Sequence, residues 1–483
     1  MSPVRLVPTT YCEVMPKYKK LAAQIEKMIE TGILTIGSRA PALRVVVKRY
    51  EVSMSTAILA YRFLENRGVL VSKEKSGFYV ATRSTSALRI PQKSNPRIES
   101  FPIRLSHSFV ELLELSKNPE YVPLGCAIPS VDVLKTSKLN RHLVTAARKN
   151  GADLNLYTEP SGDLRLRMEL CRHIASWGQN VAPENLIVTN GCTEALYLAL
   201  KVTTKPGDTV VIESPAYFGV LQILESLSLR VFELPTDFHD GIDTEVLETI
   251  LCLHQPAVLV LSSSYSNPLG STMNQNEKLK VLALVEKFKI TLIEDDVYGD
   301  LTFEVNRPKP YSALTSKADV LYCGSLSKTV APGSRVGWIT SRYHIQSLLE
   351  IKLATTLAGP ALIQAAVASY LSSGDYNRHL IRIRRIFQVS LESMRLAVEK
   401  YFPKNTFASL PKGGFILWVV LPKKIDTRKL LDQALEENIC FVPGDMFSAS
   451  GGYSNALRLS AGYIWDNIAE AAIKRLGTLA KEY

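Results

Sequence analysis

The 483-residue sequence predicts an α/β protein built on a mainly parallel sheet with helices on both faces, preceded by a small basic domain of helices and a hairpin. The large part is predicted by short apolar runs that alternate with helical segments and by polar side chains that follow these runs. The small part is predicted by a basic excess confined to the first ninety residues. The hydrophobic content of 46% and charged content of 21% are typical of a globular protein.

The net charge of +11 is unevenly distributed along the chain. Residues 1–90 contain fifteen Lys and Arg, six Glu and no Asp, so nine of the eleven net positive charges lie there. An excess of this kind indicates a polyanionic partner, bound through phosphate contacts and counterion release. A solvated basic surface is the alternative that charge alone leaves open.

The composition also argues against several classes of protein. The seven cysteines form no CxxC pair and the seven histidines no cluster, which indicates reduced cytosolic thiols and no metal site. The sequence does not open with a signal-peptide type of segment. Apolar runs such as FILWVVL are far shorter than the roughly 20 residues that a membrane helix needs. We therefore expect a cytoplasmic protein without a membrane contact.

The first ninety residues predict three helices and a hairpin. Apolar residues recur at helical spacing until Gly32, a second helix starts near Pro41, and a third runs from the N-cap Ser53 to Gly68. Residues 69–81 have the pattern of two short strands joined by a turn. This order is a winged helix-turn-helix, whose third helix would enter the major groove of DNA. A three-helix protein-binding module is the alternative.

The segment after the hairpin separates the two predicted domains. Residues 82–115 show no sustained period and are rich in Ser, Pro, Arg and Lys, which predicts a flexible tether. The predicted division is thus a DNA-binding domain at 11–81, this linker, and a domain at 116–483. The last domain has a large part at about 150–365 and a small part at about 370–483.

From about residue 180 the large domain alternates strands and helices. The runs NLIVT, TVVIE, AVLVLSS and ITLIED are strand-like, and TEALYLALKV and NEKLKVLALVEKF are helical. In parallel sheets of this kind, ligands bind at the carboxyl ends of strands and at helix N-termini. Polar groups follow the successive strands and indicate one shared site: Gly191, Cys192 and Thr193, then Tyr217, Asn267, Asp295 and Tyr298, then Ser325, Ser327, Lys328 and Arg335.

The groups at these strand ends match the parts of one ligand. The Lys328 amine can form a Schiff base with an aldehyde, and the Asp295 carboxylate can pair with a protonated ring nitrogen. Pyridoxal 5′-phosphate has both of these parts. Its other parts also have matching groups: a phosphate (Thr193, Ser325, Arg335 and helix amides), a phenolic oxygen (Asn267 and Tyr298) and a planar ring (Tyr217).

These motifs resemble those of the fold-type I aminotransferases, which depend on pyridoxal phosphate. The resemblance covers roughly residues 120–480 and includes YTEPSGDLRLR, NGCTEAL, ESPAYFG, NPLG, EDDVYGD, SLSKTVAPGSRVGW, GGFILWV and ALRLS. It implies a smaller α/β domain after the main sheet and an internal aldimine at Lys328. It further implies that Arg458 clamps a substrate carboxylate. Tyr157 would reach the phosphate of a neighbouring subunit, which implies a homodimer.

The N-terminal domain resembles the GntR family of bacterial regulators. The family pattern of P-S-x-R, G-V-S-R-x-T-V, L-x-x-x-G and S-G-x-x-V is met here by PALR, EVSMSTA, LENRG and SGFYV. In two departures, Ala42 replaces a Ser and Met54 replaces an Arg of the recognition helix, so we expect weaker binding or an unusual site. The resemblance implies DNA contacts by Arg44, Ser53, Ser55, Thr56 and Gly77.

A winged-helix domain in front of an aminotransferase-like domain resembles the MocR subfamily of GntR regulators. This resemblance implies a transcriptional regulator of the bacterial cytosol that holds pyridoxal phosphate as a Lys328 aldimine and senses an amino acid or amine. Because Arg458 would bind a carboxylate, an amino acid is the favoured effector. Two alternatives stay open: an active aminotransferase (transaminase) with an accessory DNA-binding domain, and a sensor of pyridoxal phosphate itself.

Overall fold

The computed structural model describes residues 16–30, 33–34, 38–66, 69–73, 77–80, 88–93, 99–103, 114–115, 118 and 120–483. These residues fall into two compact units that divide between Thr85 and Ser86. We call the unit before this division the head and the unit after it the body.

The head has the predicted winged helix-turn-helix elements. Ser53 caps the third helix as expected, because its Oγ accepts a hydrogen bond of 3.1 Å from the backbone N–H of Thr56. The fully buried Tyr61 anchors this helix on the loop before the second one by donating a 2.7 Å hydrogen bond to the carbonyl of Pro41. The predicted helix ends at Gly32 and Gly68 lie outside the described residues. The elements are α1 (Lys17–Glu30), α2 (Leu43–Tyr50), α3 (Met54–Asn66), β1 (Leu70–Lys73) and β2 (Gly77–Val80).

The body is built on a nine-stranded sheet with the order β3-β7-β6-β9-β10-β11-β12-β5, and β8 pairs with β7. Neighbouring strands from β7 to β11 are parallel, which confirms the predicted mainly parallel sheet. β12 runs antiparallel to both of its neighbours. The strands are β3 (Phe101–Pro102), β5 (Leu186–Thr189), β6 (Thr209–Ser214), β7 (Arg230–Asp237), β8 (Gly241–Ile242), β9 (Val258–Ser262), β10 (Thr291–Asp295), β11 (Val320–Ser325) and β12 (Gly337–Thr340).

Helices cover both faces of this sheet, as predicted. Alternate strand residues point to opposite faces, so in β5 Ile187 packs under one helical layer and Val188 under the other. One layer contains α8 (Cys192–Thr203), α9 (Phe218–Ser226) and α12 (Ile345–Thr355). The other contains α7 (Leu164–Ala175), α10 (Thr244–His254), α11 (Gln275–Phe288), α13 (Ala361–Ser372) and the start of α14 (Asp375–Tyr401). α5 (Val131–Leu134) and α6 (Ser137–Asn150) precede these layers in the chain.

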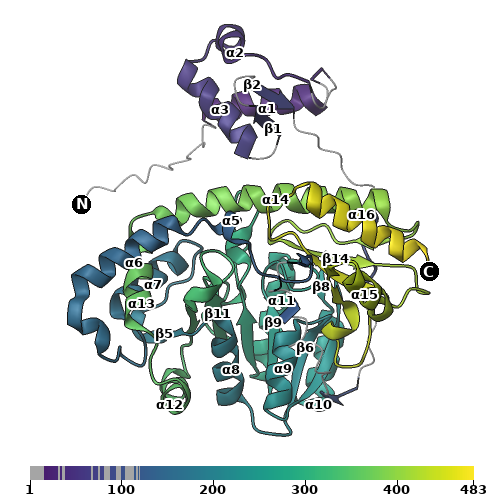
Figure 1. The fold of residues 1–483 in the computed structure, drawn as a ribbon. Helices are drawn as coiled ribbons and strands as arrows, with labels where there is room; N and C mark the ends of the chain where they lie inside the picture. Colours follow the sequence, from purple (N-terminus) through teal and green to yellow (C-terminus); the bar gives the residue numbers. More distant parts are fainter. Residues whose placement is uncertain are drawn as a thin grey trace, which may run out of the picture. The chain divides into compact units, whose positions relative to one another are not determined.

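A smaller α/β part follows in the sequence, as the resemblance implied. Its antiparallel sheet has the order β13-β14-β17-β16 and packs on the end of α14 and on α16, which run side by side along the body (Figure 1). Its elements are β13 (Phe407–Ala408), β14 (Ile416–Val420), α15 (Thr427–Glu436), β15 (Ile439–Cys440), β16 (Val442–Pro443), β17 (Ala456–Ser460) and α16 (Asn467–Lys481). The short strand β4 (Val122–Pro123), which lies earlier in the chain, pairs with β15. The body's 3₁₀ turns are 151–155, 183–185, 299–301, 311–313, 332–334 and 444–447.

Parts of the segment predicted as a tether lie against the body instead. β3 pairs with β7, and Ile103 next to it is buried. The carbonyl of Leu88 accepts a hydrogen bond from Arg395, and the Arg89 guanidinium lies over the Phe407 ring at 5.2 Å. The sequence did not predict these contacts because they are isolated and leave no periodic pattern.

Within the part of the chain that the structure describes, no helix is long and apolar enough to cross a bilayer. The same residues include no group of three or more His, Cys, Asp or Glu side chains placed to hold a metal ion.

Two isoleucines on α16 test the packing of the small part. Ile473 is fully buried, whereas Ile468 on the same helix is 65% exposed. We expect Ile473→Ala to lower the free energy of unfolding by about 2–5 kcal/mol, because a large buried side chain is removed. Ile468→Ala should change it by less than about 0.5 kcal/mol. Urea unfolding followed by circular dichroism measures both, and equal losses would contradict this packing of α16.

Candidate functional site

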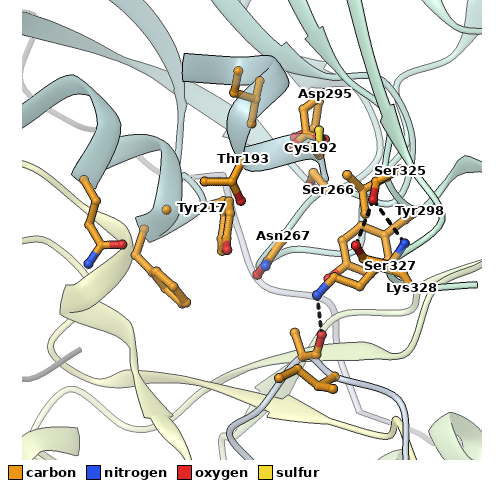
Figure 2. A pocket seen from close by; sticks show the side chains of 18 of the residues that line it. Cys192, Thr193, Tyr217, Ser266, Asn267, Asp295, Tyr298, Ser325, Ser327 and Lys328 are labelled. Atoms are coloured by element: carbon orange, nitrogen blue, oxygen red, sulfur yellow. Dashed lines mark hydrogen bonds between the residues drawn. The ribbon is translucent and has the colours of Figure 1, made fainter. Parts of the chain in front are cut away.

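A cavity of about 460 Å³ lies at the carboxyl ends of the parallel strands of the body. The strands place their ends at one edge, because Asp295 at the end of β10 is in register with Ser262 of β9 and Cys323 of β11. Figure 2 shows side chains from these separate strand ends converging on the cavity. The lining of the cavity includes eleven of the predicted site residues: Cys192, Thr193, Tyr217, Asn267, Asp295, Tyr298, Ser325, Ser327, Lys328, Arg335 and Arg458.

Lys328 extends into the cavity from the turn that follows β11. Its Nζ donates a 2.7 Å hydrogen bond to the backbone carbonyl of Ala127, drawn as a dashed line in Figure 2. Burial, together with the nearby Arg458 guanidinium, lowers the pKa of Lys328 to about 8. The neutral amine, which is the nucleophilic form, is therefore populated much closer to neutral pH than that of an ordinary lysine.

Asp295 ends β10 and brings a buried carboxylate to the cavity. Burial and the adjacent Asp296 raise the pKa of Asp295 to about 6. The Cys192 thiol lies 3.6 Å from Oδ1 as a weak hydrogen-bond donor. Among the described residues Asp295 has no salt bridge, so a cationic group beside it would favour its ionised form.

The start of α8 and the turn after β11 form an anion-binding surface. The Ser325 and Ser327 hydroxyls lie 2.9 Å apart, and Arg335 Nη1 is 3.5 Å from the Ser327 hydroxyl. Arg335 Nη2 donates a 2.7 Å hydrogen bond to the carbonyl of Asn190, which lays the guanidinium against Gly191. A side chain at Gly191 would collide with that guanidinium, and its φ of +84° also favours glycine. Helix amides, two hydroxyls and a guanidinium suit a phosphate.

Arg458 lies on β17 and is 1% exposed. Its Nη1 donates to Asn267 Oδ1 at 3.0 Å, and its Nη2 donates to the carbonyl of Gly125. The guanidinium carbon lies 5.4 Å and 5.1 Å from the ring centroids of Phe218 and Phe447. No salt bridge to a described residue neutralises it, so a carboxylate in the cavity would supply the missing opposite charge.

Two tyrosines complete the polar lining. Tyr298 is 6% exposed, and its hydroxyl has no hydrogen-bond partner among the described residues. Such a group favours a ligand oxygen, because an unsatisfied buried hydroxyl is costly. Tyr217 is held over the first turn of α9, and burial raises its pKa to about 12, so it stays neutral. The Tyr298 hydroxyl without a partner fits the phenolic oxygen of pyridoxal phosphate, and the Asp295 carboxylate fits its ring nitrogen. The hydroxyls and guanidinium of the anion-binding surface fit its phosphate.

The structure leaves Tyr157 outside the cavity. Its side chain is 85% exposed and faces solvent. A position of this kind agrees with the expected contact to a second subunit and does not test it.

The predicted DNA-contacting residues lie on α2, at the start of α3 and at the start of β2 of the head. Arg44 is exposed on α2, and Gly77 opens β2 with a φ of +99°. Ser53 Oγ also lies 2.9 Å from Ser55 Oγ and 2.8 Å from Thr56 Oγ1, so the three hydroxyls cluster at the start of α3. Met54 in the same turn is 41% exposed.

Several contacts of the site were missed by the sequence analysis. The carbonyls that receive Lys328 and Arg458 belong to Ala127 and Gly125, and backbone contacts leave no sequence signal. A buried cluster under β10 was also missed, although the motif EDDVYGD contains two of its members. Arg307 donates to Asp296 and Asp300, and its guanidinium lies 3.9 Å from the Trp177 ring centroid. Burial raises the pKa of Asp300, but His173 and Arg307 outweigh it and leave that pKa well below its usual range.

The chain matches two known families. Residues 126–475 match the aminotransferase class I and II family, which is more than half of the chain. Residues 17–80 match the gntR family of bacterial regulatory proteins.

Whole-chain and body-only similarities differ in kind. An uncharacterised HTH-type transcriptional regulator of Escherichia coli, YdcR, is 33% identical over 97% of this chain and 100% of its own length. A crystal structure of LysN, the α-aminoadipate aminotransferase of Thermus thermophilus, is 30% identical, with a TM-score of 0.73 over 79% of this chain and 96% of its own. The kynurenine aminotransferase of Pyrococcus horikoshii is 28% identical, with the same TM-score over 78% and 95%. The chain therefore belongs to the aminotransferase class I and II family and, with its GntR-type head, to the MocR subfamily of GntR regulators.

Proposed function

We propose that this DNA-binding regulator holds pyridoxal phosphate at Lys328 and responds to an amino acid whose carboxylate binds Arg458. The observation that carries the proposal is a buried amine and a buried guanidinium that face one cavity and lack ion-pair partners among the described residues. Regulators similar over the whole chain share the head, whereas the aminotransferases match only the body.

Pyridoxal phosphate is the cofactor of this fold, and solved relatives contain it as PMP or as a phosphopyridoxyl amino acid. When bound, it supplies an aldehyde that reacts with amines and a ring that accepts electrons. In this chain Lys328 would attach the aldehyde through its neutral amine, and Asp295 would hold a proton on the ring nitrogen. Other residues would hold the phosphate (Thr193, Ser325, Ser327, Arg335 and the amides after Gly191), the ring face (Tyr217) and the phenolic oxygen (Asn267 and Tyr298).

Arg458 selects the class of effector. A guanidinium binds a carboxylate in a bidentate, charge-assisted manner, which a simple amine cannot offer. Because Arg458 belongs to the small sheet and Lys328 to the large one, an amino acid bound at both groups would favour one separation of the two sheets. A change in this separation would pass to the paired heads and alter how they bind two half-sites.

A homodimer in the bacterial cytosol is part of the proposal. Tyr157 is exposed and lies next to Leu156, which is 67% exposed, and Val131 is 79% exposed. Such exposed apolar side chains are typical of a surface that a second copy covers. Tyr157 would then reach the phosphate held by the partner chain.

Transaminase activity is a second candidate. The cavity favours it, because its lining includes the amine of Lys328, the carboxylate of Asp295 and the phosphate-binding groups that this chemistry needs. Release of a 2-oxo acid from an amino acid by the purified protein would support this function. Binding without release would support sensing alone.

Replacement of Lys328 tests covalent cofactor binding. Lys328→Ala removes the amine, so the protein incubated with pyridoxal phosphate should lose its visible absorbance band and its response to amino acids. DNA binding by the head should persist. Lys412→Ala, at an exposed lysine of the body, is the matched control and should keep the band. A retained response in Lys328→Ala would contradict the proposal.

Arg458→Ala tests the effector class. The variant should weaken amino-acid binding by about tenfold or more, since a buried charge-assisted pair is lost, and should leave binding of the corresponding decarboxylated amine nearly unchanged. Absorbance titrations with an amino acid and its amine measure both affinities. Arg475→Ala, at a partly exposed arginine, is the control. Equal losses for the two ligands would overturn the carboxylate assignment.

Arg44→Ala tests the DNA contact of the head. We expect lower affinity on all sequences and a salt dependence of the logarithm of the binding constant that is flatter by about one unit, because one phosphate contact disappears. Arg141→Ala, at an exposed arginine of α6, should change neither quantity. Fluorescence anisotropy at several salt concentrations supplies the slope, and an unchanged slope would rule out a phosphate contact by Arg44.

A further inference from the structure

The body contains a second cavity, of about 380 Å³, which shares no lining residue with the first. Its walls come from the large sheet, from the small sheet and from the segment that precedes β3. The large sheet contributes the loop after β6 and the end of β7 with the residue that follows it, and Leu269 lies beside them. The small sheet contributes β13, β14 and the loops before β13, after β14 and before β17, and residues 91–92 complete the lining. A volume of this size is in the range of small-molecule sites. The proposed regulator function makes no use of it.

The lining favours a planar aromatic molecule. Apolar atoms make up most of the surface of the cavity. Four aromatic side chains from different elements face it: Phe238, Phe407, Trp418 and Tyr453. Trp418 is 2% exposed and packs edge-on against Tyr453, with ring centroids 5.8 Å apart. Rings arranged in this way favour a flat aromatic ligand through offset and edge contacts.

The charge of the lining favours a ligand with a carboxylate. Lys423 is the one charged residue among those that line the cavity, and it forms no ion pair with any described residue. A second cation lies at the edge, since the Arg89 guanidinium covers the Phe407 ring. The described lining includes no acidic side chain, and the amides of Asn405 and Gln92 add hydrogen-bond donors at the rim.

The second cavity is connected to the first through packed side chains. Trp418 is paired in register with Arg458 across β14 and β17, so both side chains leave the sheet on the same face. Phe447 contacts both, at 5.5 Å from the Trp418 ring centroid and 5.1 Å from the Arg458 guanidinium carbon. The Tyr453 hydroxyl lies 2.9 Å from the Ser214 hydroxyl at the end of β6.

We propose that this cavity is a binding site for a small aromatic carboxylate, separate from the pyridoxal phosphate site. Lys423 binds the carboxylate at the rim, and the ring lies against Trp418 and Phe238. Because the ligand contacts the large sheet, the small sheet and residues 91–92 at once, its binding favours one arrangement of the two sheets.

The test uses the full-length protein loaded with pyridoxal phosphate and reduced with borohydride, so that the first cavity is blocked. Indole-3-acetate is the probe, and isothermal titration calorimetry measures its binding. We expect one equivalent to bind. Val420→Phe should weaken binding by at least about tenfold, since its ring fills the cavity, while Val305→Phe at a 79% exposed position should not. Circular dichroism and the absorbance of the reduced cofactor verify that both variants fold.

Lys423→Ala and the neutral analogue indole-3-acetamide test the charge separately, without altering the core. Each should weaken binding by about threefold, and combining them should add nothing further, because both remove the same charge pair. Absence of probe binding to the reduced protein, or binding that Val420→Phe leaves unchanged, would overturn the site. Equal binding of the acid and the amide would overturn the carboxylate assignment.

Discussion

Three buried charged side chains face the main cavity without an ion-pair partner among the described residues: Lys328, Asp295 and Arg458. Burial of unpaired charge is expensive, and each pKa is displaced toward the neutral form as a result. A stable core would not retain such groups for packing alone. The surrounding structure is best understood as the support that holds these three charges at one place.

The parallel sheet supplies that support. Because β10 and β11 are parallel and in register, Asp295 at the end of β10 lies beside the turn after β11 that contains Lys328. The first residues of α8 lie at the same edge of the sheet. Beneath them, Arg307 fixes Asp296 and Asp300 in a buried pair of salt bridges. Tyr376 of α14 donates to Asp300 at 2.7 Å and lies 3.2 Å from the Thr329 hydroxyl, so the helix holds the residue next to Lys328. The groups that face the cavity are therefore positioned by residues that do not line it.

Much of this arrangement could be predicted from the sequence, because apolar runs and the polar residues after them are local signals. The apolar runs predicted the bounds of β5, β6, β9 and β10 to within about one residue at each end. The predicted polar residues after these strands line one cavity. The antiparallel β12 could not be predicted, since its place between β11 and β5 depends on partners far apart in the chain. Carbonyl acceptors such as Ala127, and the docking of the segment around Leu88, depend on backbone geometry, which no residue type encodes.

The buried charges of the main cavity come from two different sheets, and in the proposed function this division is what would couple ligand binding to a change of arrangement. Asp295 ends a strand of the large sheet and Lys328 lies in the turn after the neighbouring strand β11, whereas Arg458 comes from the small sheet, where Phe447 lies against it and Trp418 is its partner in register. A molecule that binds only the large sheet leaves the position of the small sheet free. One that also binds Arg458 contributes free energy to a single separation of the sheets, and only such a differential interaction can shift a conformational equilibrium. In the proposed function, the contact that would orient a substrate in an enzyme would also be the one that stabilises a single arrangement of the body.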